Sequence, residues 1–192
     1  MGSFLLIFFI LFQYWGSYLS EESDLRELPN MIHLNPNVRF YSSTSDTISF
    51  HSPLEKITIL AVSGKTEPEE LQYTYSVLLD LHGSLKRKKT GQITSLIVGN
   101  DKNLTSRITE QLTSYWKPDH SVWRIAPLDS LSFQNLTDST ENKDLLNTSL
   151  SDSFLYLVDK NGVIRAKYDI NQNQITARII TDISLLLRKE RH

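Results

Sequence analysis

Residues 57–85 read ITILAVSGKTEPEELQYTYSVLLDLHGSL and predict a buried strand that leads into a helix. The apolar run Ile57–Val62 has the length and composition of a strand buried on both faces of a sheet. Thr66 and Glu69 have the spacing of a capping box, and Pro68 falls in the first helical turn, where its missing N–H costs nothing. The expected core stripe of this helix is Leu71, Tyr75, Leu78, His82 and Leu85.

A second strand and a second helix follow this unit. Ile93–Val98 is the next apolar run, and Asn100 or Asp101 is placed to cap the helix behind it. The expected stripe of that helix is Leu104, Ile108, Leu112 and Tyr115. Val122–Ile125 then predicts a short strand. Repeated strand–helix–strand units imply right-handed crossovers and a parallel centre of the sheet.

Two hairpins flank the strand–helix units. Val38–Tyr41 and Thr47–Phe50 are short β-type runs around a polar turn. Phe154–Val158 and Val163–Tyr168 enclose Asn161-Gly162, a strong hairpin turn signal. The second hairpin therefore adds antiparallel strands to the parallel centre.

The remaining segments are a long loop and a last helix. Leu131–Ser151 is rich in Ser, Thr, Asn and Asp and predicts a loop, with one helical turn around Lys143–Leu146. Asn171 and Gln174 are cap candidates for the last helix. Its expected stripe is Ile175, Ile179, Ile183 and Leu186. The order of elements predicts an α/β protein with a three-layer, thioredoxin-like fold, a mixed central sheet and helices on both faces.

Composition excludes several classes of function. The 192 residues carry 20 Lys and Arg against 22 Asp and Glu, which argues against nucleic-acid binding. A hydrophobic content of 40% is sufficient for a packed core. The chain contains no cysteine, so disulfides, thiol redox catalysis, cysteine nucleophiles and zinc fingers are excluded.

The amino terminus predicts a membrane leader. Phe4–Leu19 is uncharged and mostly apolar, at the short limit for a bilayer span, and reads as a signal peptide or a signal anchor. Trp15 and Tyr18 spoil the small-residue cleavage pattern and favour an uncleaved anchor. We therefore divide the chain into an anchor at 1–19, a polar tether at 20–36 and a domain at 37–192, with that domain exported to the periplasm or an equivalent compartment.

The second hairpin carries a resemblance to a known family. Residues 153–168, SFLYLVDKNGVIRAKY, are similar to the C-terminal hairpin of Sco/SenC proteins, the thioredoxin-fold copper chaperones of cytochrome c oxidase assembly. That hairpin has an apolar run, an Asp, a turn that ends in Gly, and an apolar-Arg-x-x-Tyr strand. Residues 93–101 and 120–125 resemble the middle third of the family. The resemblance extends over residues 38–189 and implies a thioredoxin-like domain.

The resemblance also implies that the metal site of the family has been lost. Members carry Cys-x-x-x-Cys followed by Pro, and a distant His before the closing hairpin. With the proline aligned on Pro68, Ser63 and Glu67 take the places of the two cysteines, and the histidine falls near Ser151. A helix N-terminus stabilises thiolates, which select Cu(I), whereas a serine hydroxyl stays protonated and a carboxylate is a hard ligand. We expect these three positions to be vestigial, with no metal and no cofactor.

Other candidate sites are weaker. The histidines are His33, His51, His82, His120 and His192, and none has metal-ligand spacing to another. His82 falls on the helix stripe and predicts a partly buried structural residue. Lys86–Lys89 is expected to be a solvated helix end or, if functional, a contact for anionic headgroups. Gly64-Lys65-Thr66 lacks the first glycine of a phosphate loop.

These observations favour a non-catalytic, membrane-tethered, Sco-like domain. It would serve as an accessory or assembly protein of a respiratory complex of the cytochrome oxidase type, through contact with protein partners such as subunits of that complex. The alternative is a protein that binds Cu(II) or Zn(II) through Glu67 with His51 or His120. A thioredoxin-like reductase or peroxidase is excluded because its thiols are missing, unless a partner supplies both thiols.

Overall fold

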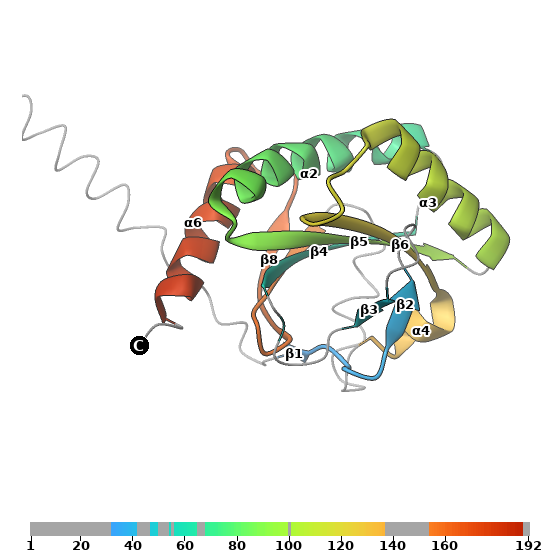
Figure 1. The fold of residues 1–192 in the computed structure, drawn as a ribbon, viewed down its shortest axis with the longest axis horizontal. Helices are drawn as coiled ribbons and strands as arrows, with labels where there is room; N and C mark the ends of the chain where they lie inside the picture. Colours follow the sequence, from blue (N-terminus) through green and yellow to red (C-terminus); the bar gives the residue numbers. More distant parts are fainter. Residues whose placement is uncertain are drawn as a thin grey trace, which may run out of the picture.

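The computed structural model describes residues 32–41, 47–49, 54, 56–64, 68–99, 101–136 and 154–189 (Figure 1). The strands are β1 (Ile32–His33), β2 (Arg39–Tyr41), β3 (Thr47–Ser49), β4 (Ile57–Ser63), β5 (Gly91–Gly99), β6 (Trp123–Asp129), β7 (Phe154–Val158) and β8 (Val163–Asp169). The helices are α2 (Pro68–Lys88), α3 (Lys102–Trp116), α4 (Ser130–Gln134) and α6 (Ile175–Lys189).

The main sheet is mixed, as predicted. Its order is β1-β8-β7-β4-β5-β6. The centre is parallel, with Ile59 of β4 opposite Ile93 of β5 and Ile93 opposite Trp123 of β6. β7 pairs antiparallel with β4, and β8 and β1 follow antiparallel. The apolar run of β4 is buried along its full length because strands cover both its edges and packed layers cover both its faces.

The long helices α2, α3 and α6 all pack on one face of this sheet (Figure 1). Ile59 and Ile93 of the sheet share a buried cluster with Leu78 of α2, Ile108 of α3 and Ile179 of α6. The reason is topological. The chain moves from β4 to β5 to β6 in one direction across the sheet, so two right-handed crossovers place both connecting helices on the same side.

The second face is covered mainly by non-helical chain. The buried cluster on this face contains Leu60 and Leu96 of the sheet. They pack with Val38, which precedes β2, with Ile48 of β3 and with Phe133 of α4. Among the described residues, α4 is therefore the helix that meets the prediction of helices on both faces. The predicted first hairpin is confirmed, since Phe40 pairs with Ile48 in a separate two-stranded sheet.

The end of α3 corrects one predicted core position. The cap is confirmed, because Asp101 Oδ1 accepts a hydrogen bond from the Asn103 N–H at 2.9 Å. Tyr115, however, is 74% exposed. Its neighbour Trp116 turns inward instead, with its ring centroid 6.0 Å from that of Tyr75. Trp116, four residues after Leu112, thus takes the core position that the predicted stripe assigned to Tyr115, three residues after Leu112.

The packed part of the chain begins before residue 37. Ile32 and His33 form β1 on the edge of β8, and Leu34 is 3% exposed. The Leu34 N–H donates to the Gly162 carbonyl at 2.9 Å, and the Asn35 N–H to the Leu136 carbonyl at 2.8 Å. Part of the segment assigned to the tether therefore belongs to the domain.

Several sequence predictions lie outside the described residues. They include the anchor over Phe4–Leu19, the first-hairpin turn, Thr66 of the capping box and the helical turn at Lys143–Leu146. Within the described ranges, no helix combines the length and the apolarity that crossing a bilayer requires.

Candidate functional site

The candidate site lies where β4 passes into α2. Ser63 is the last residue of β4, and α2 begins at Pro68. The parallel strands β4 and β5 both end near this point, where Ser63 is opposite Ile97. The carboxyl end of parallel strands, next to a helix N-terminus with its positive dipole, is the usual place for ligands in α/β sheets.

Ser63 is buried at this junction. It is 5% exposed, whereas the following Gly64 is exposed. Ile59 and Ala61 pack in the cluster beneath the long helices, so strand alternation places Ser63 on the same face. Of the predicted vestigial positions, Ser63 is described by the structure, while Glu67 and Ser151 lie outside the described residues.

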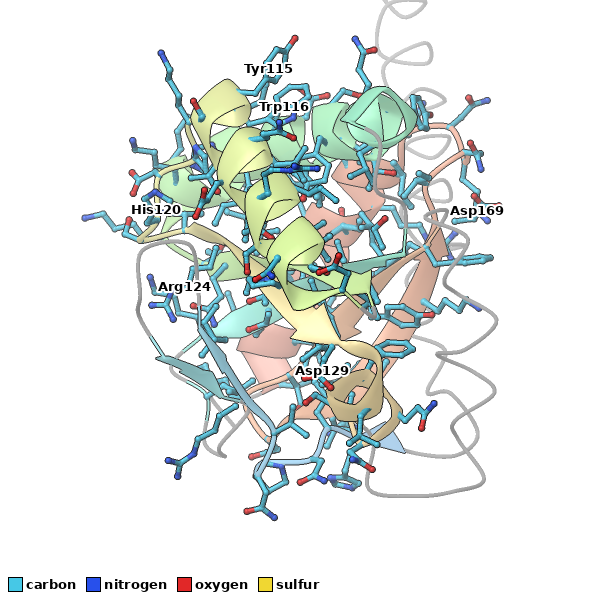
Figure 2. The ribbon with its side chains drawn as sticks, turned by 90° about the vertical axis from the view of Figure 1, so that its right-hand side faces the viewer. Tyr115, Trp116, His120, Arg124, Asp129 and Asp169 are labelled. Atoms are coloured by element: carbon cyan, nitrogen blue, oxygen red, sulfur yellow. The ribbon has the colours of Figure 1, made fainter. Side chains whose placement is uncertain are left out.

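Carboxylates at the same end of the sheet are engaged in local structure. Asp101, Asp129 and Asp169 each accept a hydrogen bond from a backbone N–H two or three residues ahead, at 2.8 or 2.9 Å. The hydroxyl and the N–H of Ser132 hold the pKa of Asp129 below its usual range. Figure 2 shows Asp129 and Asp169 on separate parts of the molecule. These carboxylates cap helices and turns.

The donor set does not fit Cu(I). In the described part of the chain, no group of three or more His, Asp or Glu side chains is placed to hold a metal ion. The whole sequence lacks cysteine, and a serine hydroxyl is a hard, protonated oxygen where Cu(I) requires soft sulfur. The chain therefore lacks the soft sulfur donors that this ion requires at the junction.

His120 lies at the opposite end of the sheet. It is in the turn that precedes β6, and β6 begins level with Ile59. Ile59 is four residues before Ser63, which corresponds to about 13 Å along the strand. His120 and Ser63 of the β4–α2 junction thus lie at opposite ends of the sheet. The other residues of the alternative metal site, Glu67 and His51, lie outside the described residues.

His82 is structural, as predicted. It is half-buried, its ring centroid is 5.9 Å from that of Trp123, and its Nε2 accepts a hydrogen bond from the Asp119 N–H at 3.3 Å. Burial lowers the pKa of His82, which the opposing charge of Asp119 only partly offsets. A neutral ring with Nε2 as acceptor fits this position.

The residues that carried the family resemblance hold the closing hairpin together. Asp159 is 4% exposed, and its Oδ1 accepts hydrogen bonds from the N–H groups of Asn161 at 2.8 Å and Val163 at 2.9 Å. Its Oδ2 accepts from Nε of Arg165 at 2.6 Å. Gly162 has φ of 75°, a conformation that favours glycine. The Asp, Gly and Arg of the pattern thus form one turn.

The Tyr of the same pattern has a different partner. Tyr168 of β8 donates a hydrogen bond of 2.6 Å to Oδ2 of Asp182 on α6, and both residues are buried. Burial, then the carboxylate, raises the pKa of Tyr168. Sequence reasoning missed Asp182 because it lies inside an apolar stripe and its partner is 14 residues away. The sequence signal that could have identified Asp182 is a single acidic residue within the apolar face of a helix, which indicates a buried hydrogen-bond partner.

No protein-family model matches this chain, and no curated protein matches it. Solved structures do. One is a SCO1/SenC family lipoprotein from Bacillus anthracis, with a TM-score of 0.60, 15% identity, and coverage of 83% of this chain and 99% of that chain. Another is BsSco, a member of the Sco family of cytochrome c oxidase assembly proteins, with a TM-score of 0.59, 15% identity, and coverage of 83% and 95%.

A third similar structure is Bradyrhizobium japonicum ScoI with copper bound, with a TM-score of 0.56, 10% identity, and coverage of 80% of this chain and 99% of that chain. At such identities the likeness establishes the fold. The chain is similar in structure to Sco/SenC proteins over most of their length, and the thioredoxin-like α/β fold that the sequence predicts is confirmed.

Proposed function

We propose that this chain is a degenerate Sco/SenC-like protein that no longer handles copper or thiols and acts through contact with other proteins. Its domain is exported and tethered to a membrane by the apolar segment Phe4–Leu19. Its role is that of a non-catalytic accessory or assembly protein of a respiratory complex of the cytochrome oxidase type.

One observation carries this proposal: a fold similar to that of copper-bound ScoI has a buried serine, Ser63, at the end of β4 and no cysteine in the chain. A helix N-terminus lowers a thiol pKa and so creates a Cu(I) ligand, but it does not ionise a serine hydroxyl to a comparable extent. The fold can still present a surface to a protein partner, but the thiolate ligands that Cu(I) binding requires are absent.

The closing hairpin also supports the proposal that the fold is present without the copper ligands. Asp159, Gly162, Arg165 and Tyr168 of the closing hairpin are present and engaged, whereas the chain has no cysteine for the β4–α2 junction. The competing hypothesis is a metal site through Glu67 with His51 or His120, and both Glu67 and His51 lie outside the described residues.

A pull-down from solubilised membranes tests the proposal. The bait is the full chain, captured with and without a Cu(I) chelator. We expect subunits or assembly components of a respiratory oxidase among the captured proteins, in equal amounts in both conditions. A capture that the chelator abolishes would show that copper is needed. Recovery of no respiratory component would contradict the assembly role.

A control bait separates the domain from its tether. A chain that ends at Ser20 retains the apolar segment and lacks the folded part. Partners that bind the domain are expected with the full chain and not with this control. Equal recovery by both baits would show that the apolar segment alone is responsible.

A further inference from the structure

The chain carries basic residues at the ends of both α2 and α6. We call this set the basic end and define it as Lys86, Arg87, Lys88, Lys89, Arg188 and Lys189. Both helices end on the left of the molecule in Figure 1. The two helices pack together near Gly91, since a Cβ on that glycine would lie 3.3 Å from Leu85 of α2 and 3.8 Å from Ile183 of α6. α6 continues for six residues beyond Ile183, to Lys189.

The positive charge of the basic end is largely uncompensated. Arg87, Lys88, Lys89, Arg188 and Lys189 are exposed. Lys86 differs from these five residues, because its Nζ forms an ion pair of 2.8 Å with Oδ2 of Asp119. The last turns of α2 and α6 contain basic residues and no acidic one.

Helix dipoles account for part of this charge. Cations in the last turn of a helix are favoured by its negative end. Lys89, however, follows α2 with φ of 53°, and its N–H donates to the Leu85 carbonyl at 2.7 Å. Glycine or asparagine is usual at such a left-handed cap, because other side chains adopt positive φ at a cost. The chain thus places a further cation where another residue would fit the backbone better.

The described chain begins at Ile32, with the apolar run Phe4–Leu19 upstream. The residues between Leu19 and Ile32, at about 3.5 Å each, extend at most about 40 Å. A domain on so short a tether stays close to the bilayer, within reach of anionic headgroups, which attract clustered Lys and Arg.

We propose that the basic end binds the anionic headgroups of the membrane surface and orients the domain with the β4–α2 junction turned away from the lipid. Strands β4 and β5 run from the level of the basic end to the junction, so contact at one end leaves the other accessible to a protein partner. This inference deepens the proposed function and rests on it, because the proposed function tethers the domain to a membrane.

The absence of cysteine permits a clean test in the full chain. Gly83→Cys introduces a single labelling site one turn before Arg87, where an added Cβ meets nothing within 4 Å. Asn171→Cys places the same label in the exposed turn at the other end of the molecule. Each variant carries a polarity-sensitive fluorophore and is mixed with vesicles of phosphatidylcholine, alone or with an equal amount of phosphatidylglycerol.

We expect the emission at position 83 to shift to the blue on phosphatidylglycerol vesicles only, and molar salt to reverse the shift. The label at position 171 is expected to stay unchanged. Arg87→Gln/Arg188→Gln in the label-bearing chain should weaken the response about thirtyfold. The matched control Arg39→Gln/Arg107→Gln removes the same charge from exposed residues elsewhere and should leave the response unchanged.

Equal shifts on both lipids, an equal response at position 171, or equal effects of the two charge variants would overturn the inference. A response to heparin without one to vesicles would assign the surface to a soluble polyanion instead. Flotation of the chain on phosphatidylcholine vesicles reports the tether separately. Flotation together with a label at position 83 that stays silent on phosphatidylglycerol vesicles rejects the basic end, whereas failure to float rejects the membrane tether of the proposed function.

Discussion

The closing hairpin and the β4–α2 junction differ in how well they match the Sco/SenC pattern that the sequence resembles. The hairpin keeps a buried carboxylate, a glycine turn, an arginine and a tyrosine, each with a partner in the structure. The junction has a buried serine, Ser63, where the resemblance places a metal-binding thiol. The residues of the pattern that stabilise the hairpin are thus present, whereas the thiols of the pattern are absent, as the proposed function expects of a binding surface.

Replacing Asp159 should give the largest loss of stability. Asp159→Ala leaves the N–H groups of Asn161 and Val163 and the guanidinium of Arg165 without this acceptor. We expect a loss of about 3 kcal/mol in the free energy of unfolding, typical for breaking a buried ion pair. Urea denaturation followed by circular dichroism measures it. A loss no larger than that of an exposed substitution such as Asn37→Ala would break the comparison.

Tyr168→Phe should rank second. It removes the hydroxyl that donates to Asp182, in a region where both side chains are buried. The expected loss is about 2 kcal/mol, because a buried carboxylate loses a charge-assisted hydrogen bond. The double variant Tyr168→Phe/Asp182→Asn should recover part of the loss. A double variant as unstable as the sum of the singles would show that the two residues act independently.

Ser63→Ala should cost less than either hairpin substitution. Removal of one buried hydroxyl corresponds to about 1 kcal/mol, and Ser63 is 5% exposed at the end of β4. The same denaturation measurement applies. If Ser63→Ala destabilised the protein more than Asp159→Ala, the junction would be an essential structural element and not a relinquished site.

The smallest effect is a pH dependence that belongs to neither region. Burial lowers the pKa of His82 in the folded state below its ordinary value of 6.5. The unfolded chain therefore binds the proton first as pH falls, and the contribution of His82 to stability is present above pH 6.5 and lost as the pH decreases below it. Denaturation midpoints between pH 8 and 5 should fall, and less so in His82→Gln. An equal decline in both proteins would assign the effect to other groups.

Much of the fold follows from local patterns in the sequence. The apolar run of β4, the Asp101 cap and the Asn161-Gly162 turn each act within a few residues, and each is found in the structure. The two-residue strand β1 was missed because it is too short to show alternation and exists through its pairing with β8. Its position depends on residues far along the chain.

The placement of layers and partners could not be predicted as well. Trp116 rather than Tyr115 turns inward because Tyr75 of α2 and the sheet provide its contacts, and helical periodicity does not distinguish the two. Asp182 pairs with Tyr168 across two elements, and no local pattern joins them. For the candidate site, the sequence predicts the position of Ser63 at the end of a strand, because a strand boundary is a local feature.

Cu(I) retention in competition with a chelator tests the central claim most directly. It compares the wild-type chain with Ser63→Cys/Glu67→Cys and with Arg107→Cys/Gln111→Cys, a matched pair with the same spacing on the exposed face of α3. We predict no retention by the wild type or the α3 pair and one Cu(I) per chain for the junction pair, because a helix N-terminus stabilises thiolates. Stoichiometric Cu(I) on the wild type, or no gain for the junction pair over the α3 pair, would contradict the account.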